Sequence, residues 1–228
     1  MATMVKYIYP ILIVLVVVFF VYMLSRLRKA TTLELERTLY AKNDPGLYLS
    51  LLANPRLRLL YRKTTLLLFS LNAQLLKGDD DAIVTTLNTL QSAPLTRGEK
   101  LEYLSKKLSY FCEKQNAIEA GNALAGIESI LKKPKPNQTI ILQECRLIYS
   151  IYIDHDMKVL KSLESSLQLQ RDPEKILTYY RIAKLRYFAG DKKAARENLL
   201  LAKNIQSQSA WSSIAAMAYD DLTILERK

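Results

Sequence analysis

The sequence is poor in the residue types that most catalytic and metal sites require. It contains one histidine and two cysteines among 228 residues, and it has no GxxxxGK[ST], GxGxxG, GxSxG or HExxH pattern. Phosphate-binding loops, nucleophile elbows and zinc-binding helices therefore find no support. We expect no cofactor and no metal ion, and we nominate no catalytic residue.

Glycine and proline are also scarce, with 6 and 7 residues, while 50% of the chain is hydrophobic. This composition argues against a turn-rich β-sandwich and against a disordered chain, so we expect an all-α fold. The two cysteines, Cys112 and Cys145, lie on apolar helical stretches and form no CxxC pair. We interpret them as buried, reduced thiols, although a disulfide between them stays open at this point.

One long hydrophobic run is present near the N-terminus. Residues 7–24, YIYPILIVLVVVFFVYML, carry no charge and as a helix would span about 27 Å, close to the hydrocarbon thickness of a bilayer. Tyr7, Tyr9 and Tyr22 lie near its ends, where aromatic rings favour the headgroup region. A cleaved signal peptide is the alternative, but only Lys6 precedes the run and no small-x-small site follows it. We predict a retained transmembrane anchor.

Positive charge is concentrated directly after this run. The chain has a formal net charge of +11, and residues 26–63 hold nine basic and three acidic side chains, a net of +6. The cations Arg26, Arg28 and Lys29 flank the run on its C-terminal side. The positive-inside rule then places the C-terminal domain in the cytoplasm and the N-terminus outside. The lipid bilayer is thus the first partner that we predict.

The remaining chain repeats a helix, a short break and a second helix. We expect an anchor with its basic flank over residues 1–30, a helical connector over 31–56, and an array of antiparallel helical hairpins over 57–228 that ends in a capping helix. The breaks inside the hairpins are predicted at residues 77–81, 115–116, 155–156 and 190–191.

Two of these breaks contain acidic clusters that resemble cation sites. Asp79, Asp80 and Asp81 precede an expected helix, and His155 lies between Asp154 and Asp156. Carboxylates at helix starts commonly cap free N–H groups, and adjacent residues on a turn point apart. We therefore interpret both clusters as turns with helix caps rather than as metal sites.

Residues 176–209 carry the most regular pattern of small and large side chains. The pattern consists of Tyr179, Ile182, Ala183, Gly190, Asp191, Ala195, Leu199 and Ala202. It resembles a tetratricopeptide repeat, in which small residues let two helices approach closely and large ones pack between hairpins. The resemblance implies an α-solenoid whose first helix in each repeat lines a concave groove. The matching groove positions here are Leu177, Tyr180, Arg181, Lys184, Tyr187 and Phe188.

Two hypotheses about function follow. The first is a membrane-anchored scaffold or adaptor, whose cationic groove binds an acidic peptide or protein partner at the cytoplasmic face. The second is a basic nucleic-acid-binding or regulatory module, because tyrosines stand beside cations, as Tyr61 does beside Arg62 and Lys63. Binding that falls steeply with salt would favour the second hypothesis. The second signal is less specific than the first.

Overall fold

The computed structural model describes residues 2–207 and 210–226, with side chains for residues 14–207 and 211–226. Over this part of the chain the fold is all-α, and no strand is present. The chain divides into two compact units, Met1–Tyr103 and Leu104–Lys228, which are described separately below. The boundary lies within helix α6 (Arg97–Glu113).

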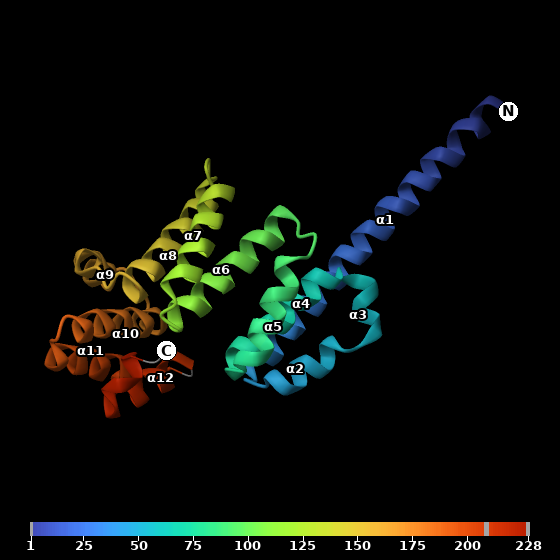
Figure 1. Ribbon diagram of the computed structural model, residues 1–228. Coiled ribbons are helices and arrows are strands. Elements are labelled where there is room, and N and C mark those ends of the chain that lie inside the picture. Colours follow the sequence, from blue (N-terminus) through green and yellow to red (C-terminus); the bar gives the residue numbers. More distant parts are fainter. Residues whose placement is uncertain (1, 208–209, 227–228) are drawn as a thin grey trace. The chain divides into compact units, whose positions relative to one another are not determined.

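The first helix of unit 1, α1 (Ala2–Glu36), is the longest element of the chain, and its N-terminal half extends away from the other helices of the unit (Figure 1). No helix within the described residues is long and apolar enough to cross a membrane. The anchor that we predicted at residues 7–24 lies partly outside the described side chains, which begin at residue 14. At its other end, α1 buries Leu35 in the core of unit 1.

The core of unit 1 forms where the end of α1 meets three short helices and a hairpin. A π-helical turn (Arg37–Ala41) follows α1 and leads through Asp44, whose carboxylate caps the next helix. The helices that follow are α2 (Pro45–Leu52), α3 (Pro55–Leu60), α4 (Lys63–Lys77) and α5 (Asp80–Gln91). Leu39, Tyr48, Leu57 and Ala73 are buried together and connect the π-helical turn with α2, α3 and α4.

The expected single helix from residue 57 to the first break is in fact two helices. Tyr61 and Arg62 adopt extended backbone conformations and separate α3 from α4. The Tyr61 hydroxyl donates to the Arg28 carbonyl at 2.8 Å, and Arg62 pairs with Glu99 at 2.8 Å. These partners lie more than 30 residues away in sequence, so helical periodicity around residue 61 does not reveal the break.

Unit 2 begins with the second half of α6 and three further helices, α7 (Ala117–Ile130), α8 (Pro136–Tyr152) and the short α9 (Leu160–Ser166). Cys112 and Cys145 are both buried and free, as predicted. Burial raises the pKa of Cys112 to about 12 and also raises that of Cys145, so both thiols stay protonated at neutral pH. The contact between Ser105 Oγ and Cys145 Sγ measures 3.9 Å.

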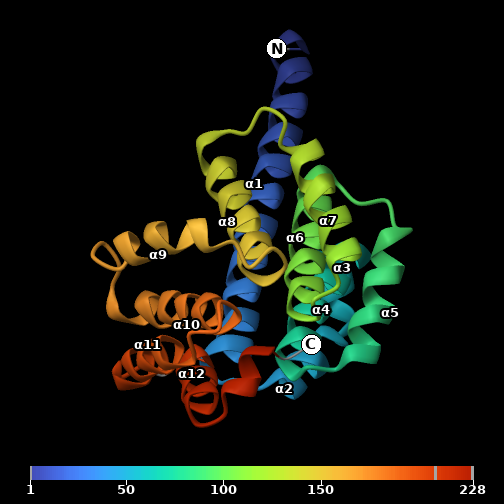
Figure 2. The same ribbon diagram turned by 60° about the vertical axis from the view of Figure 1, so that its left-hand side comes forward.

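The second part of unit 2 contains α10 (Asp172–Phe188), α11 (Lys192–Asn204) and α12 (Ala210–Asp220), which lie side by side (Figure 2). Ala183, Ala195 and Ala202 are fully buried where α10 packs on α11, as the small residues of the pattern predicted. The expected capping helix, α12, does not reach the end of the described residues. It ends at Asp220, and a 3₁₀ turn, η3 (Leu222–Glu226), follows it.

The turn residues act largely as the sequence predicts. Gly78 and Gly190 adopt left-handed conformations with φ of 69° and 85°. Asp79 caps α5 by accepting from Ala82 N at 3.2 Å, and Asp156 accepts from Lys158 N at 2.9 Å. The acidic clusters at both breaks are therefore confirmed as helix caps.

Candidate functional site

Helix α10 carries all the residues predicted to line a partner-binding groove. It starts after Arg171, whose backbone N–H donates to the Glu174 carboxylate at 3.3 Å, and it ends before Gly190, whose left-handed backbone stops the helix. Buried residues lie on every side of α10, because α8, α9, α11, α12 and η3 all surround it. The sequence pattern alone predicts only one buried face.

Four of the six predicted groove residues are buried: Tyr180, Arg181, Lys184 and Tyr187. Leu177 and Phe188 are half-buried. We expected an open groove, but in this structure the chain's own C-terminal residues cover the face. Lys184 contacts the Leu225 carbonyl, and Tyr187 contacts the Glu226 carboxylate. The Tyr180 ring lies 5.4 Å from that of Trp211.

Arg181 belongs to the same face but has a different partner. Its guanidinium forms an ion pair with Glu144 of α8. Of the two predicted cations, therefore, one binds a side chain of a neighbouring helix and the other binds a backbone carbonyl. Glu144 and η3 are the functional neighbours that sequence reasoning missed. A signal for η3 exists in Asp221, a capping residue that interrupts the apolar periodicity of the last helix and accepts from Thr223 N at 3.0 Å.

Lys184 is the most unusual group of this site. Its side chain is 2% exposed, and Nζ donates to the Leu225 carbonyl oxygen at 2.6 Å. Nζ also lies 4.7 Å from the centre of the Tyr152 ring and 5.5 Å from that of Phe188. Burial lowers the pKa of Lys184 to about 8, against the opposing effect of Glu113. A buried ammonium group is costly unless it is satisfied, so η3 and the two rings are needed here.

His155 lies next to this cluster. It stacks on Phe188 with ring centres 3.7 Å apart and has a positive φ of 49°. Burial and the nearby Lys184 lower its pKa, which favours the neutral ring. Its Nε2 atom has no hydrogen-bond partner among the described residues. No group of three or more potential metal ligands occurs within the described part of the chain.

The residues predicted to flank a membrane, Arg26, Arg28 and Lys29, form a second region, on α1 of unit 1. All three are exposed, and their side chains make no ion pair with the described residues. Tyr61 fixes this part of α1, because its hydroxyl contacts the Arg28 carbonyl at 2.8 Å and the Thr32 hydroxyl at 2.9 Å.

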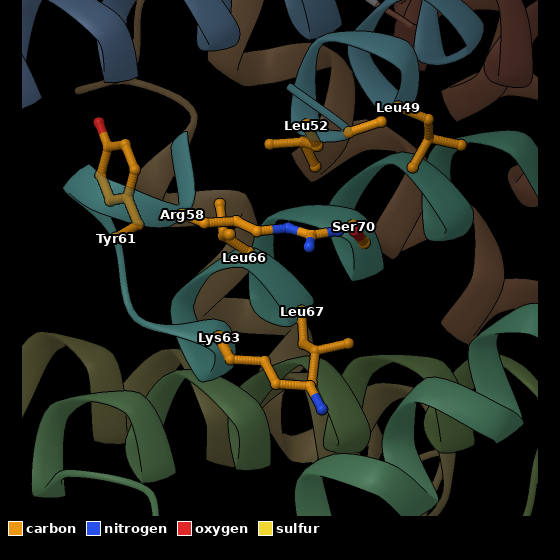
Figure 3. A pocket seen from close by; sticks show the side chains of 9 residues that line it. Leu49, Leu52, Arg58, Tyr61, Lys63, Leu66, Leu67 and Ser70 are labelled. Carbon is orange, nitrogen blue, oxygen red and sulfur yellow. The ribbon is translucent and has the colours of Figure 1, made fainter. Parts of the chain in front are cut away.

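Tyr61 also borders a pocket of about 640 Å³ between α2, α3 and α4 (Figure 3). The pocket is lined by leucines and by two cations, Arg58 and Lys63. Figure 3 shows the extended Arg58 side chain across the middle of the pocket, while the Tyr61 hydroxyl points away from it. The complete lining consists of Leu49, Leu52, Ala53, Arg58, Tyr61, Lys63, Leu66, Leu67 and Ser70.

The cations that stand beside tyrosines differ in their accessibility. Arg181 and Lys184 are buried, and Arg62 donates to both Glu99 and the Pro94 carbonyl. These three are therefore already engaged within the protein, whereas Lys63 remains exposed.

Comparison of the sequence and the structure with models of protein families, curated proteins and solved structures finds no match.

Proposed function

We propose that the protein is a membrane-anchored helical adaptor: α1 is a single-pass anchor, and the helical hairpins, which resemble tetratricopeptide repeats, bind a protein or peptide partner at the cytoplasmic face. The observation that carries the proposal is the contrast between the two ends of α1. Residues 14–23 are apolar and 50–64% exposed on every face of the helix, whereas Leu35 near its other end is buried.

An all-round apolar helical surface has a clear physical interpretation. Ten residues make almost three turns of helix, so no face of residues 14–23 is protected by the rest of unit 1. A helix that is hydrophobic on all sides is typical of a membrane span, and apolar surface of this extent marks an interaction site. Because α1 continues into the core, a span here would fix the folded unit to the bilayer.

The direction of insertion follows from the charges beside the exposed stretch. Arg26, Arg28 and Lys29 lie within one and a half turns of α1 and are free of ion pairs with the described residues. Lysine and arginine near a span are retained on the cytoplasmic side. We therefore place units 1 and 2 in the cytoplasm and the N-terminus outside.

The partner-binding part of the proposal rests on what covers α10. η3 supplies a buried leucine, a backbone carbonyl to Lys184 and a carboxylate to Tyr187. A partner segment with an aliphatic residue followed by an acidic one offers the same three groups. We propose that such a segment replaces η3 on α10. Anchoring raises the local concentration of the partner, so modest affinity is sufficient.

A peptide in trans tests this exchange. Leu225→Asp puts a carboxylate at a fully buried position and should release η3 from α10. A labelled peptide with the sequence of residues 221–226, DLTILE, should bind the Leu225→Asp chain about tenfold or more tightly than the wild-type chain, where the attached segment competes at millimolar effective concentration. Fluorescence anisotropy measures both affinities.

Two controls keep the result specific. The same peptide with aspartate in place of the leucine that corresponds to Leu225 should not bind, and circular dichroism should show that the Leu225→Asp chain keeps its helix content. Equal, weak binding of both peptides to a folded Leu225→Asp chain would show that α10 is not a peptide site.

A further inference from the structure

We infer that the pocket between α2, α3 and α4 binds one anionic phospholipid, with the phosphate held by Arg58 and Lys63 and the start of an acyl chain packed on leucines. The inference rests on the proposed membrane anchor and adds a lipid ligand to it. The pocket volume of about 640 Å³ falls within the range of small-molecule sites.

The charges of the pocket select an anion. Arg58 and Lys63 make no ion pair and no side-chain hydrogen bond with the described residues, and no acidic side chain lines the pocket. The neighbouring Arg62 differs, because Glu99 already neutralises it at 2.8 Å. Arginine and lysine donate strong charge-assisted hydrogen bonds to phosphate oxygens. Figure 3 shows the Arg58 guanidinium in the middle of the pocket and the Lys63 ammonium pointing away from it. Both side chains are exposed, so the flexible Lys63 can turn toward a phosphate that Arg58 holds.

The apolar part of the lining selects an acyl chain rather than a soluble phosphate. Leu49, Leu52, Leu66 and Leu67 line the same space as the two cations. On α3, Leu59 is 85% exposed. A protruding leucine between cations is typical of helices that lie in the headgroup region of a membrane. The surface around the pocket thus matches an amphiphile with one negative end.

Tyr61 connects the pocket to the part of α1 that follows the predicted span. Tyr61 lines the pocket and contacts the backbone of Arg28 and the side chain of Thr32. These residues follow Leu24, the end of the predicted span, by about 6 and 12 Å along the helix axis. The headgroup layer begins where the hydrocarbon ends and is about 5–8 Å thick. The contact of Tyr61 with Arg28 therefore falls at the depth of the headgroup layer and that with Thr32 just beyond it, so a pocket lined by Tyr61 is within reach of a lipid headgroup.

Native mass spectrometry of the full chain in detergent micelles tests the site. The wild-type chain should retain one phosphatidylglycerol and should prefer it to phosphatidylcholine. Arg58→Gln with Lys63→Gln removes both donors and should weaken phosphatidylglycerol binding about tenfold or more. Ala53→Trp keeps both cations but fills the space and should have a similar effect.

The matched control is Arg56→Gln with Lys42→Gln, which removes the same charge from exposed positions outside the pocket. It should retain affinity within about twofold, because general attraction to anionic lipid is spread over many cations. Equal loss in the control and pocket variants, or no preference for phosphatidylglycerol in the wild type, would overturn the inference. Release of the lipid by millimolar glycerol 3-phosphate would also overturn it, because a soluble phosphate would then be the ligand.

Alkaline extraction from phosphatidylcholine vesicles separates this inference from the proposed anchor. Every variant keeps residues 7–24, so each should resist extraction as the wild type does. A chain that resists extraction without selecting phosphatidylglycerol would contradict the pocket alone. A chain that binds phosphatidylglycerol in micelles but is extracted from vesicles would contradict the anchor alone.

Discussion

Glu99 shows at the scale of a single residue how unit 1 is held together. Its carboxylate accepts from the hydroxyls of Thr64 at 2.6 Å and Thr65 at 2.9 Å, and from the backbone N–H of Thr96 at 2.9 Å. Arg62 adds an ion pair at 2.8 Å. Burial alone would raise the pKa of Glu99, but the hydrogen bonds outweigh burial and lower its pKa to about 2. The start of α6 is thereby fixed to α4.

Glu99→Gln should lower the free energy of unfolding by about 2 kcal/mol at pH 7, because charge-assisted hydrogen bonds to a carboxylate are lost. The pKa in the folded chain lies below the ordinary value of 4.5, so the contribution is complete above pH 4.5 and is lost as the pH falls toward 2. The difference between wild type and Glu99→Gln should therefore shrink over this range in urea unfolding.

The exposed Glu36 provides the control within the same unit, and Glu36→Gln should change the free energy of unfolding by less than about 0.5 kcal/mol. A Glu99→Gln deficit that stays constant between pH 4.5 and 2 would contradict a contribution from the ionised carboxylate.

The sequence pattern predicted which residues lie at the candidate site on α10, but it did not predict how deeply they are buried. Helical spacing placed Tyr180, Arg181, Lys184 and Tyr187 on one helix, and they do lie there. The burial of Lys184 and Tyr187 depends on η3, which folds back because Asp221 starts a new turn after α12. Such a long-range contact leaves no periodic trace around residue 184. The sequence therefore does not indicate that a lysine here is enclosed by two aromatic rings.

At the scale of elements, glycine in the turn between α4 and α5 determines where the hairpin reverses. Gly78 has a φ of 69°, and its backbone N–H bonds to the Leu75 carbonyl at 3.2 Å. Asp79 then caps α5. This combination of a left-handed residue and an aspartate cap recurs at Gly190 and Asp191 between α10 and α11. Both turns were predictable, because their chemistry is local.

Gly78→Ala should destabilise unit 1 by about 1 kcal/mol, because a Cβ atom disfavours the left-handed conformation even where no neighbour obstructs it. Gly98→Ala is the matched change at the start of α6, where φ is not positive and space is also open. It should be neutral or stabilise by up to about 1 kcal/mol. Urea unfolding of the two variants measures both effects, and equal midpoints would contradict the conformational explanation.

The break between α3 and α4 is a helix boundary that the sequence pattern did not predict. The apolar residues on both sides of Tyr61 continue with helical spacing, yet the backbone is extended at Tyr61 and Arg62. Contacts with Arg28, Glu99 and the Pro94 carbonyl fix the two residues. The pocket beside them was consequently not predicted, since it exists only because α3 and α4 are separate helices.

At the scale of the whole molecule, we propose that one helix, α1, connects the helical hairpins to a membrane. Residues 14–23 are exposed and apolar on all faces. The cations Arg26, Arg28 and Lys29 follow them directly, and Arg58 and Lys63 lie at a pocket connected to the same stretch of α1 through Tyr61. All these features belong to unit 1, while the candidate peptide site belongs to unit 2.

The depth of α1 in a bilayer tests the central claim most directly. Nitroxide labels at Val18→Cys, Leu59→Cys and Ser129→Cys report oxygen and nickel-complex accessibility in vesicles, and the buried Cys112 and Cys145 should not react. We predict high oxygen and low nickel accessibility at residue 18, the reverse at residue 129, and intermediate values at residue 59. Water-like accessibility at residue 18, equal to that at residue 129, would contradict the membrane anchor.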